Sequence, residues 1–225
     1  MSFAPHLLQL LKVHFKSLLN VSALVLGIVN GLFLLKLYLR DRPKLEVQPV
    51  NPEFYQWWFS MPGGRHNEDK TRRYGFLTYV DVVNKGLRKT ELDSWWLCLQ
   101  TKEQGKHRLN PINMPEPKAT IGELVKFYPV LGQKGINWHG STLTEPGCSI
   151  TGMVFCEYEC YGGESWDPVI HNGKISATFV AKSVFGQTCR CAIEFSEKSL
   201  DEMKAMAPGI HLTSKSQKND SPGQS

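Results

Sequence analysis

Residues 174–195 read KISATFVAKSVFGQTCRCAIEF, and this stretch decides the fold because its apolar residues and cysteines recur at every second position. Alternation with a period of two is typical of a β-strand that has one buried face and one exposed face. The pattern breaks at Phe185-Gly186-Gln187 and then resumes, which predicts an antiparallel hairpin. The side chains expected to face the core are Ile175, Ala177, Phe179, Ala181, Cys189, Cys191, Ile193 and Phe195.

Four other stretches carry strand signals. Residues 76–83 are rich in β-branched and aromatic residues and stop at the turn signal Asn84-Lys85-Gly86. Residues 45–50 and 90–100 alternate in the same way as the hairpin, and residues 148–160 follow a proline-glycine turn. Short strands that do not alternate with helices are typical of an all-β sandwich.

Three short motifs accompany these strands: VDVVNKG at 80–86, LTEPG at 143–147 and the hairpin over Gly186. With them, the layout of residues 44–196 resembles the immunoglobulin-like or fibronectin-like sandwiches that many single-pass bacterial membrane proteins carry. The resemblance implies an all-β fold, an immunoglobulin-like antiparallel β-sandwich. Because unrelated sandwiches share such motifs, the resemblance concerns the fold and not the function.

The N-terminal part of the chain has a different character. Residues 17–35 contain no charged side chain, and a helix of that length spans the ~30 Å hydrocarbon core of a bilayer. We therefore predict a transmembrane helix at 17–39, after a short segment 1–16 that can form an interfacial helix. A cleavable signal peptide is the competing interpretation, but residues 36–40 lack the small side chains suited to cleavage.

Two features of this helix concern its contact with a second helix and the side of the membrane on which the β domain lies. Gly27 and Gly31 have the spacing that lets a second helix approach closely, although glycine is also simply frequent in membrane helices. Two lysines precede the span, and four basic residues follow it: Lys36, Arg40, Arg42 and Lys44. With the amino terminus counted on the first side, the excess is about one charge, and it places the C-terminal domain in the cytoplasm.

The net charge of +5 is local to the N-terminal segment. Residues 1–44 hold six basic side chains and one acidic side chain, which leaves 20 of each sign in residues 45–225. The β domain is therefore neutral as a whole, and this balance argues against a nucleic acid as its partner.

Two irregular segments separate the predicted strands. Residues 101–141 form a long insertion that is rich in proline and basic residues, with a short helix expected at 121–127. The second segment is the loop 60–73, which carries the basic residues Arg65, Lys70, Arg72 and Arg73.

The C-terminal residues contain one further element. Ser199 and Glu202 have the spacing of a capping box, which predicts a short helix within 197–207. The polar residues 208–225 predict a disordered tail.

The cysteine and histidine residues are the candidates for metal binding or thiol chemistry in this chain. Cys189 and Cys191, with His171 shortly before them, offer an alternative metal site. Packing of both cysteines in the core is the preferred interpretation, and disulfides between different strands become relevant if the domain is extracytoplasmic. No nucleophile-elbow, zinc-protease, phosphate-loop or dinucleotide motif occurs, so we predict no catalytic residue and no cofactor.

A partner surface is expected near the aromatic segment 54–59. A strand there would bury only one of Trp57 and Trp58, and Trp58 is the candidate for the exposed position. Nearby and juxtamembrane basic residues complete the predicted contact set, namely Arg65, Arg72, Arg73, Lys36, Arg40, Arg42 and Lys44.

These features predict a non-enzymatic, membrane-anchored adaptor or accessory subunit that presents a β-sandwich to a protein partner. Residues 17–39 would contact membrane lipid, and the basic residues could instead bind anionic headgroups. The alternative function is a metal-dependent or thiol enzyme that uses the cysteine and histidine residues of the sandwich.

Overall fold

A computed structural model describes all of the chain except residues 1–3, 67–68, 115–116, 122–123, 132–142 and 211–225. The chain divides into two compact units, residues 1–42 and residues 43–225. The first is a single helix, and the second is mostly β-structure built on a mixed sheet. An apolar N-terminal helix followed by a β domain is therefore confirmed. Of the predicted tail 208–225, the first three residues are described and end in the fully buried Ile210, while residues 211–225 lie outside the described residues.

The first unit is the helix α1 (Ala4–Asp41). From residue 20 onward nearly all its side chains are exposed, including Leu24 at 66% and Leu26 at 74%. The segment Asn20–Asp41 is long and apolar enough to span a membrane or to act as a signal sequence. A side chain added at Gly27 or Gly31 would meet no atom within 4 Å. Among the described residues, nothing packs against α1 at these two glycines.

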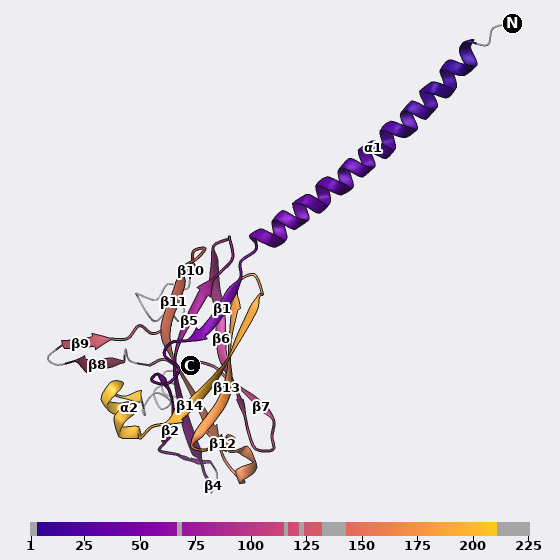
Figure 1. Ribbon diagram of the computed structural model, residues 1–225. Coiled ribbons are helices and arrows are strands. Elements are labelled where there is room, and N and C mark those ends of the chain that lie inside the picture. Colours follow the sequence, from indigo (N-terminus) through magenta and orange to yellow (C-terminus); the bar gives the residue numbers. More distant parts are fainter. Residues whose placement is uncertain (1–3, 67–68, 115–116, 122–123, 132–142, 211–225) are drawn as a thin grey trace, which may run out of the picture. The chain divides into compact units, whose positions relative to one another are not determined.

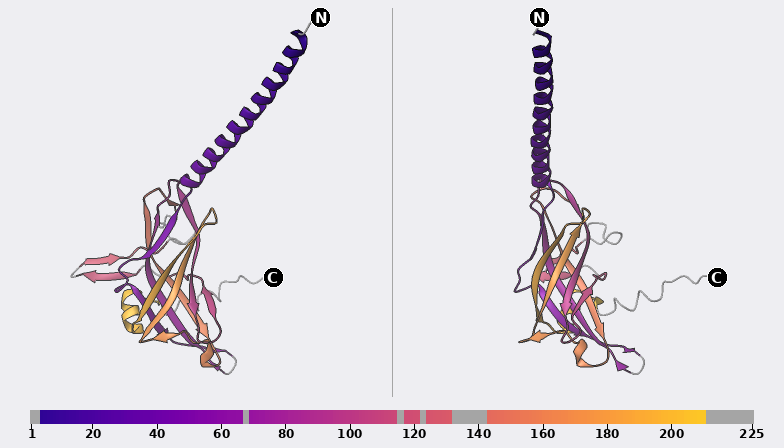
Figure 2. Two further views of the ribbon diagram at one scale, coloured as in Figure 1. Left: turned by 45° about the vertical axis from the view of Figure 1, so that its right-hand side comes forward. Right: turned by 90° about the vertical axis from the view of Figure 1, so that its right-hand side faces the viewer.

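Among its described residues, the second unit contains fourteen strands and two short helices. Figures 1 and 2 show how these elements are arranged. The strands are β1 (Leu45–Pro49), β2 (Gln56–Met61), β3 (Arg65–His66), β4 (Asp69–Lys70), β5 (Arg72–Asn84), β6 (Thr90–Gln100), β7 (Lys106–Leu109), β8 (Lys118–Ile121), β9 (Leu124–Phe127), β10 (Leu143–Thr144), β11 (Ser149–Cys160), β12 (Ile170–His171), β13 (Lys174–Ser183) and β14 (Thr188–Glu197). The helices are η1 (Glu164–Trp166) and α2 (Leu200–Met206).

Ten of these strands form one sheet. The long strand β5 pairs with β11 along one edge and with β1 and then β2 along the other. From β2 the sheet continues through β14, β13 and β6, and β6 pairs with β7 and β10. All these pairs are antiparallel except β2 with β14.

The sheet curls until its two ends meet. Just after β7, Pro111 forms an isolated bridge with Cys156 of β11. Next to it, the amide of Ile112 donates to the carbonyl of Phe155 at 2.8 Å. The two terminal parts of the sheet are thereby connected, and one apolar cluster, which includes Phe76, Phe179 and Phe195, lies inside.

A second apolar cluster lies on the other face of β2, β5 and β11 and includes Phe59, Phe155 and Met203 of α2. The capping box of α2 is confirmed, because the side chain of Ser199 accepts from the amide of Glu202 and the Glu202 side chain accepts from the amide of Ser199. This helix covers apolar side chains that a bare sheet would expose to water.

The structure tests two local predictions. The hairpin is confirmed, since β13 and β14 pair from Lys174 with Ser196 to Lys182 with Thr188. The helix expected at 121–127 is wrong, because β8 and β9 form a hairpin in which Lys118 lies opposite Phe127. Val125 and Phe127 favour strands, and pairing across the hairpin satisfies their backbone groups without a helix.

Candidate functional site

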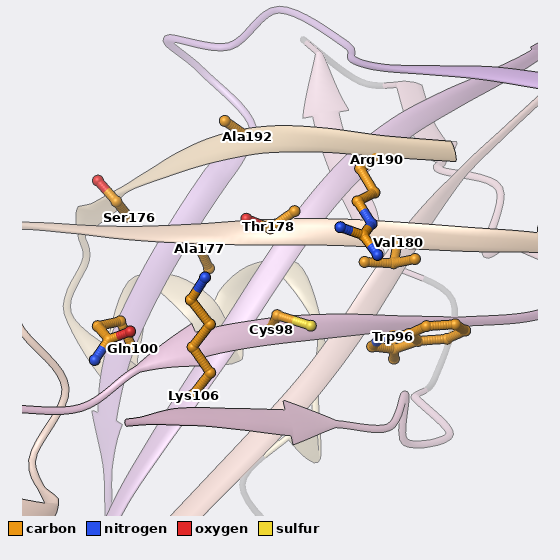
Figure 3. Close-up of a pocket in the computed structure, with 10 residues that line it drawn as sticks. All are labelled: Trp96, Cys98, Gln100, Lys106, Ser176, Ala177, Thr178, Val180, Arg190 and Ala192. Carbon is orange, nitrogen blue, oxygen red and sulfur yellow. The ribbon is translucent and has the colours of Figure 1, made fainter. Parts of the chain in front are cut away.

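The candidate site is a trough on the outer face of the sheet, over β6, β13 and β14 (Figure 3). The core-facing residues of these strands alternate with residues that point outward, and the pairing sets the outward residues side by side. Thr178 of β13 lies between Cys98 of β6 and Ala192 of β14. Val180 lies between Trp96 and Arg190.

The trough is hollow because its central side chains are small while those at its margins are long. Its volume is about 410 Å³. The residues that line it are Trp96, Cys98, Gln100, Lys106, Ser176, Ala177, Thr178, Val180, Arg190 and Ala192.

The small side chains at the centre of the trough form its floor, and three cations lie around this floor. Lys106 lies opposite Gln100, and Arg108 lies opposite Cys98 in the β6–β7 pair. The guanidinium of Arg108 stands 4.0 Å from the ring centroid of Trp96, within the range of a cation–π contact. In Figure 3, the amine of Lys106 and the guanidinium of Arg190 extend over the small residues of β13.

These cations are available to a ligand. Lys106, Arg108 and Arg190 are exposed, and within the described part of the chain none of them forms an ion pair with a carboxylate. The acidic residue on the neighbouring outward row, Glu194, is held by Lys174 at 2.5 Å. The trough therefore carries a positive charge and suits a carboxylate or phosphate, which arginine binds through two parallel hydrogen bonds.

Sequence reasoning did not identify this site. The alternation of residues 174–195 placed Arg190 on the exposed face, but Lys106 and Arg108 belong to the predicted insertion. They reach the same face only because β7 pairs with β6 and β6 pairs with β13. That order of strands has no local signal in the sequence.

The prediction that Trp58 is an exposed contact residue is wrong. Trp58 is 5% exposed, and its Nε1 donates to the carbonyl of Gly173 at 2.9 Å. Trp57 is the less buried of the two and packs edge-on against Tyr55, with ring centroids 5.7 Å apart. Both faces of β2 are covered, so Trp58 belongs to the core.

Two of the predicted loop cations also have structural roles. Arg73 lies within β5, is nearly buried, and forms an ion pair with Glu157. Arg72 donates from Nε to Asp167 at 2.6 Å and also binds the carbonyls of Gly162 and Gly163. Neither residue is part of a solvated basic loop, and the side chain of Arg65 lies outside the described residues.

The four predicted juxtamembrane cations lie at the end of α1 and just after it. Lys36, Arg40, Arg42 and Lys44 are exposed, and Arg40 pairs with Asp41 at 2.9 Å. Their contact with lipid headgroups stays a prediction.

The alternative metal site is not assembled. His171 pairs with Lys174, whereas Cys189 pairs with Ala181, seven residues further along β13. At ~3.3 Å per residue the two side chains start roughly 23 Å apart, which is too far for one metal ion. Within the described residues no group of three histidine, cysteine, aspartate or glutamate side chains is suitably placed.

The cysteines do not have the character of catalytic nucleophiles. All six are unpaired. Desolvation raises the pKa of Cys189 and of Cys191, and it raises the pKa of Cys156 to about 12. A reactive thiol requires the opposite shift, toward the thiolate at neutral pH.

The thiols should therefore differ strongly in reactivity. Cys148 is exposed, whereas Cys156 is buried and, with a pKa of about 12, is a thiolate in roughly one molecule in 10⁴ at pH 8. We expect N-ethylmaleimide at pH 8 to modify Cys148 in the folded protein and Cys156 only after guanidinium is added. Peptide mass spectrometry measures the extent of modification of Cys148 and of Cys156 in one sample. Equal rates before unfolding would contradict the burial of Cys156.

No protein-family model matches the chain, and no curated protein matches it significantly. Among solved structures it is similar to the X-ray structure of Northeast Structural Genomics Consortium target SoR45. That similarity has 10% sequence identity and covers 70% of this chain and 89% of the other, with a TM-score of 0.26. A similarity at this TM-score supports no conclusion about function.

Proposed function

We propose that the protein is a non-enzymatic, membrane-anchored adaptor whose trough binds an acidic segment of a partner protein. One observation carries the proposal: Lys106, Arg108 and Arg190 surround a floor of small side chains and have no carboxylate partner in the described chain. Exposed cations without a carboxylate partner attract an acidic segment, which favours fast and specific association.

The form of the trough supports a protein partner. A volume of about 410 Å³, open along a sheet face, accommodates several side chains of an extended segment. Trp96 adds an aromatic surface beside Arg108, and residues of this type are common at the centres of protein interfaces. An acidic segment with an apolar residue between two carboxylates would use both features.

The same proposal includes three assignments made from the sequence. The β domain is of the immunoglobulin-like class, it lies on the cytoplasmic side, and α1 anchors it in the membrane with Gly27 and Gly31 available for self-association. The buried Trp95 and the antiparallel β13–β14 hairpin support the first assignment. The charge difference across the span supports the second.

The test uses the full-length protein in its native membrane with a photo-reactive amino acid at Thr178, in the trough floor. We expect a cross-link to an acidic segment of one protein. The double change Lys106→Glu and Arg190→Glu should reduce its yield at least tenfold, because attraction becomes repulsion at two points. The charge-matched control is Lys198→Glu with Lys204→Glu, which changes two half-buried lysines just before and within α2 that pair with Glu202 and Asp201.

The two sets of variants separate the outcomes. A cross-link that is lost in the trough variant and kept in the α2 variant supports the adaptor. A cross-link to protein that is insensitive to the trough charges would show that the cations do not bind the partner. Adducts with lipid alone would overturn the protein partner.

A further inference from the structure

A second surface lies at the end of the β domain where the chain enters it from α1. We call it the collar and define it by the exposed residues Lys44, Leu87, Arg88, Val184 and Phe185. The amide of Lys85 donates to the carbonyl of Lys44 at 2.7 Å, so the β5–β6 turn adjoins the start of β1. The amide of Val184 donates to the carbonyl of Glu91 at 3.0 Å, which joins the β13–β14 turn to the same end.

The collar is held in a fixed form by Asn84. This side chain is fully buried, and its Oδ1 accepts from the amides of Gly86 and Lys44. Its Nδ2 donates to the carbonyls of Arg88 at 2.7 Å and Thr144 at 3.3 Å. One asparagine thus ties together three segments at this end, including the β5–β6 turn that carries Leu87. The β13–β14 turn is held separately, by the hydrogen bond from Val184 to Glu91.

The apolar tips are unusual for turns. Leu87 is 60% exposed, Val184 is 45% exposed and Phe185 is 65% exposed. Turns normally carry polar residues, and large apolar side chains gathered on one surface indicate contact with a membrane or a protein. Gly186, with φ of 79°, closes the β13–β14 turn and leaves Phe185 at its tip.

One collar residue, Lys44, lies close to the end of α1 along the chain. The helix ends at Asp41 and β1 begins at Leu45. Four residues span at most about 14 Å when fully extended, whatever the orientation of the helix. If α1 crosses a bilayer, the start of β1, which the collar adjoins, must therefore lie within that distance of the end of the helix.

We propose that the collar contacts the headgroup region of the membrane that holds α1. This inference rests on the anchoring role of α1 in the proposed function. Phe185, Val184 and Leu87 would lie at the level of the lipid carbonyl groups. Lys44 and Arg88 would contact the phosphates, since basic residues beside a span are attracted to anionic lipid. The contact would restrict how the β domain, and with it the trough, is presented to a partner.

The probe is the full-length protein in nanodiscs of phosphatidylcholine and phosphatidylglycerol at a ratio of 3:1. A diazirine-bearing amino acid replaces Phe185 in one sample. The matched control carries it at Ile170, which is 41% exposed and pairs with Ile175, roughly 26 Å along β13 from Ser183. A third sample carries it at Leu26 of α1 and reports on the anchor.

We expect lipid adducts at position 185 to be at least tenfold more abundant than at position 170. The additional change Leu87→Ser should reduce them several-fold. Adducts at 26 with equal yields at 185 and 170 would overturn the collar and leave the anchor intact. No lipid adduct at 26 would overturn the anchor and the collar together. A protein adduct at 185 in native membranes, without lipid adducts, would assign this surface to a protein.

Discussion

Replacing Arg73 with leucine lowers the free energy of unfolding by about 3–5 kcal/mol, because it leaves the carboxylate of Glu157 buried without its partner. The two side chains are 7% and 6% exposed, and Arg73 also donates to the carbonyl of Pro62 at 3.1 Å. Denaturant unfolding followed by circular dichroism measures the loss. The double change Arg73→Leu with Glu157→Leu should recover most of it, since no buried charge then remains.

The loss should also depend on pH. Burial raises the pKa of Glu157, and Arg73 beside it opposes that rise. In Arg73→Leu the opposition disappears, so the pKa of the folded state rises further above that of the unfolded state. A raised pKa favours the folded state while the group is protonated, and this contribution is lost as pH increases through the folded-state pKa. The variant should therefore be closest to the parent at acidic pH. A deficit that is larger at pH 4 than at pH 8 would contradict the assignment.

Trp58→Ala should lower the free energy of unfolding by about 3–5 kcal/mol through the cavity it creates. Trp58 is 5% exposed, packs near Tyr74 and donates a hydrogen bond to Gly173. Trp58→Phe keeps most of the packing and should lose about 1 kcal/mol with the hydrogen bond, plus a smaller packing contribution. Thermal and denaturant unfolding of both variants provide the comparison. A Trp58→Ala protein as stable as the parent would contradict the burial of Trp58.

The strands and the hairpin were predictable because alternation is a local property. β13 and β14 show a regular period of two, and Asn84-Lys85-Gly86 marked the end of β5. The apolar N-terminal helix was predictable for the same reason. In each case the signal lies within about 20 adjacent residues and does not depend on distant parts of the chain.

The burial of Trp58 and Arg73 could not be predicted from local alternation. The period of two correctly separated Trp57 from Trp58, but it could not show that β2 has apolar clusters on both faces. The sequence analysis placed Arg73 in a loop, because it lies before the apolar run that begins at Phe76. In the structure, pairing with β11 as far as Cys160 extends β5 to include Arg73. Its partner Glu157 lies 84 residues away. Burial of both side chains therefore follows from long-range pairing.

The trough depends on long-range pairing even more strongly. Its cations come from β7 and β14, and the intervening strands β6 and β13 are also distant from each other in sequence. The sequence analysis placed residues 101–141 in an irregular insertion outside the predicted strands. In the structure, part of that insertion contributes a strand to the sheet and two cations to its outer face.

The position of β14 has a consequence for the nascent chain. β14 is the last strand to be synthesised, yet it lies between β2 and β13, with Ser196 opposite Trp57. The ribosome adds about 5–20 residues per second, so β2 waits roughly 7–27 s for this neighbour. During that interval the edge of β2 that pairs with β14 remains open, and an open apolar strand edge is a site of aggregation. Protection of β2 by a chaperone during this delay would therefore raise the yield of folded protein.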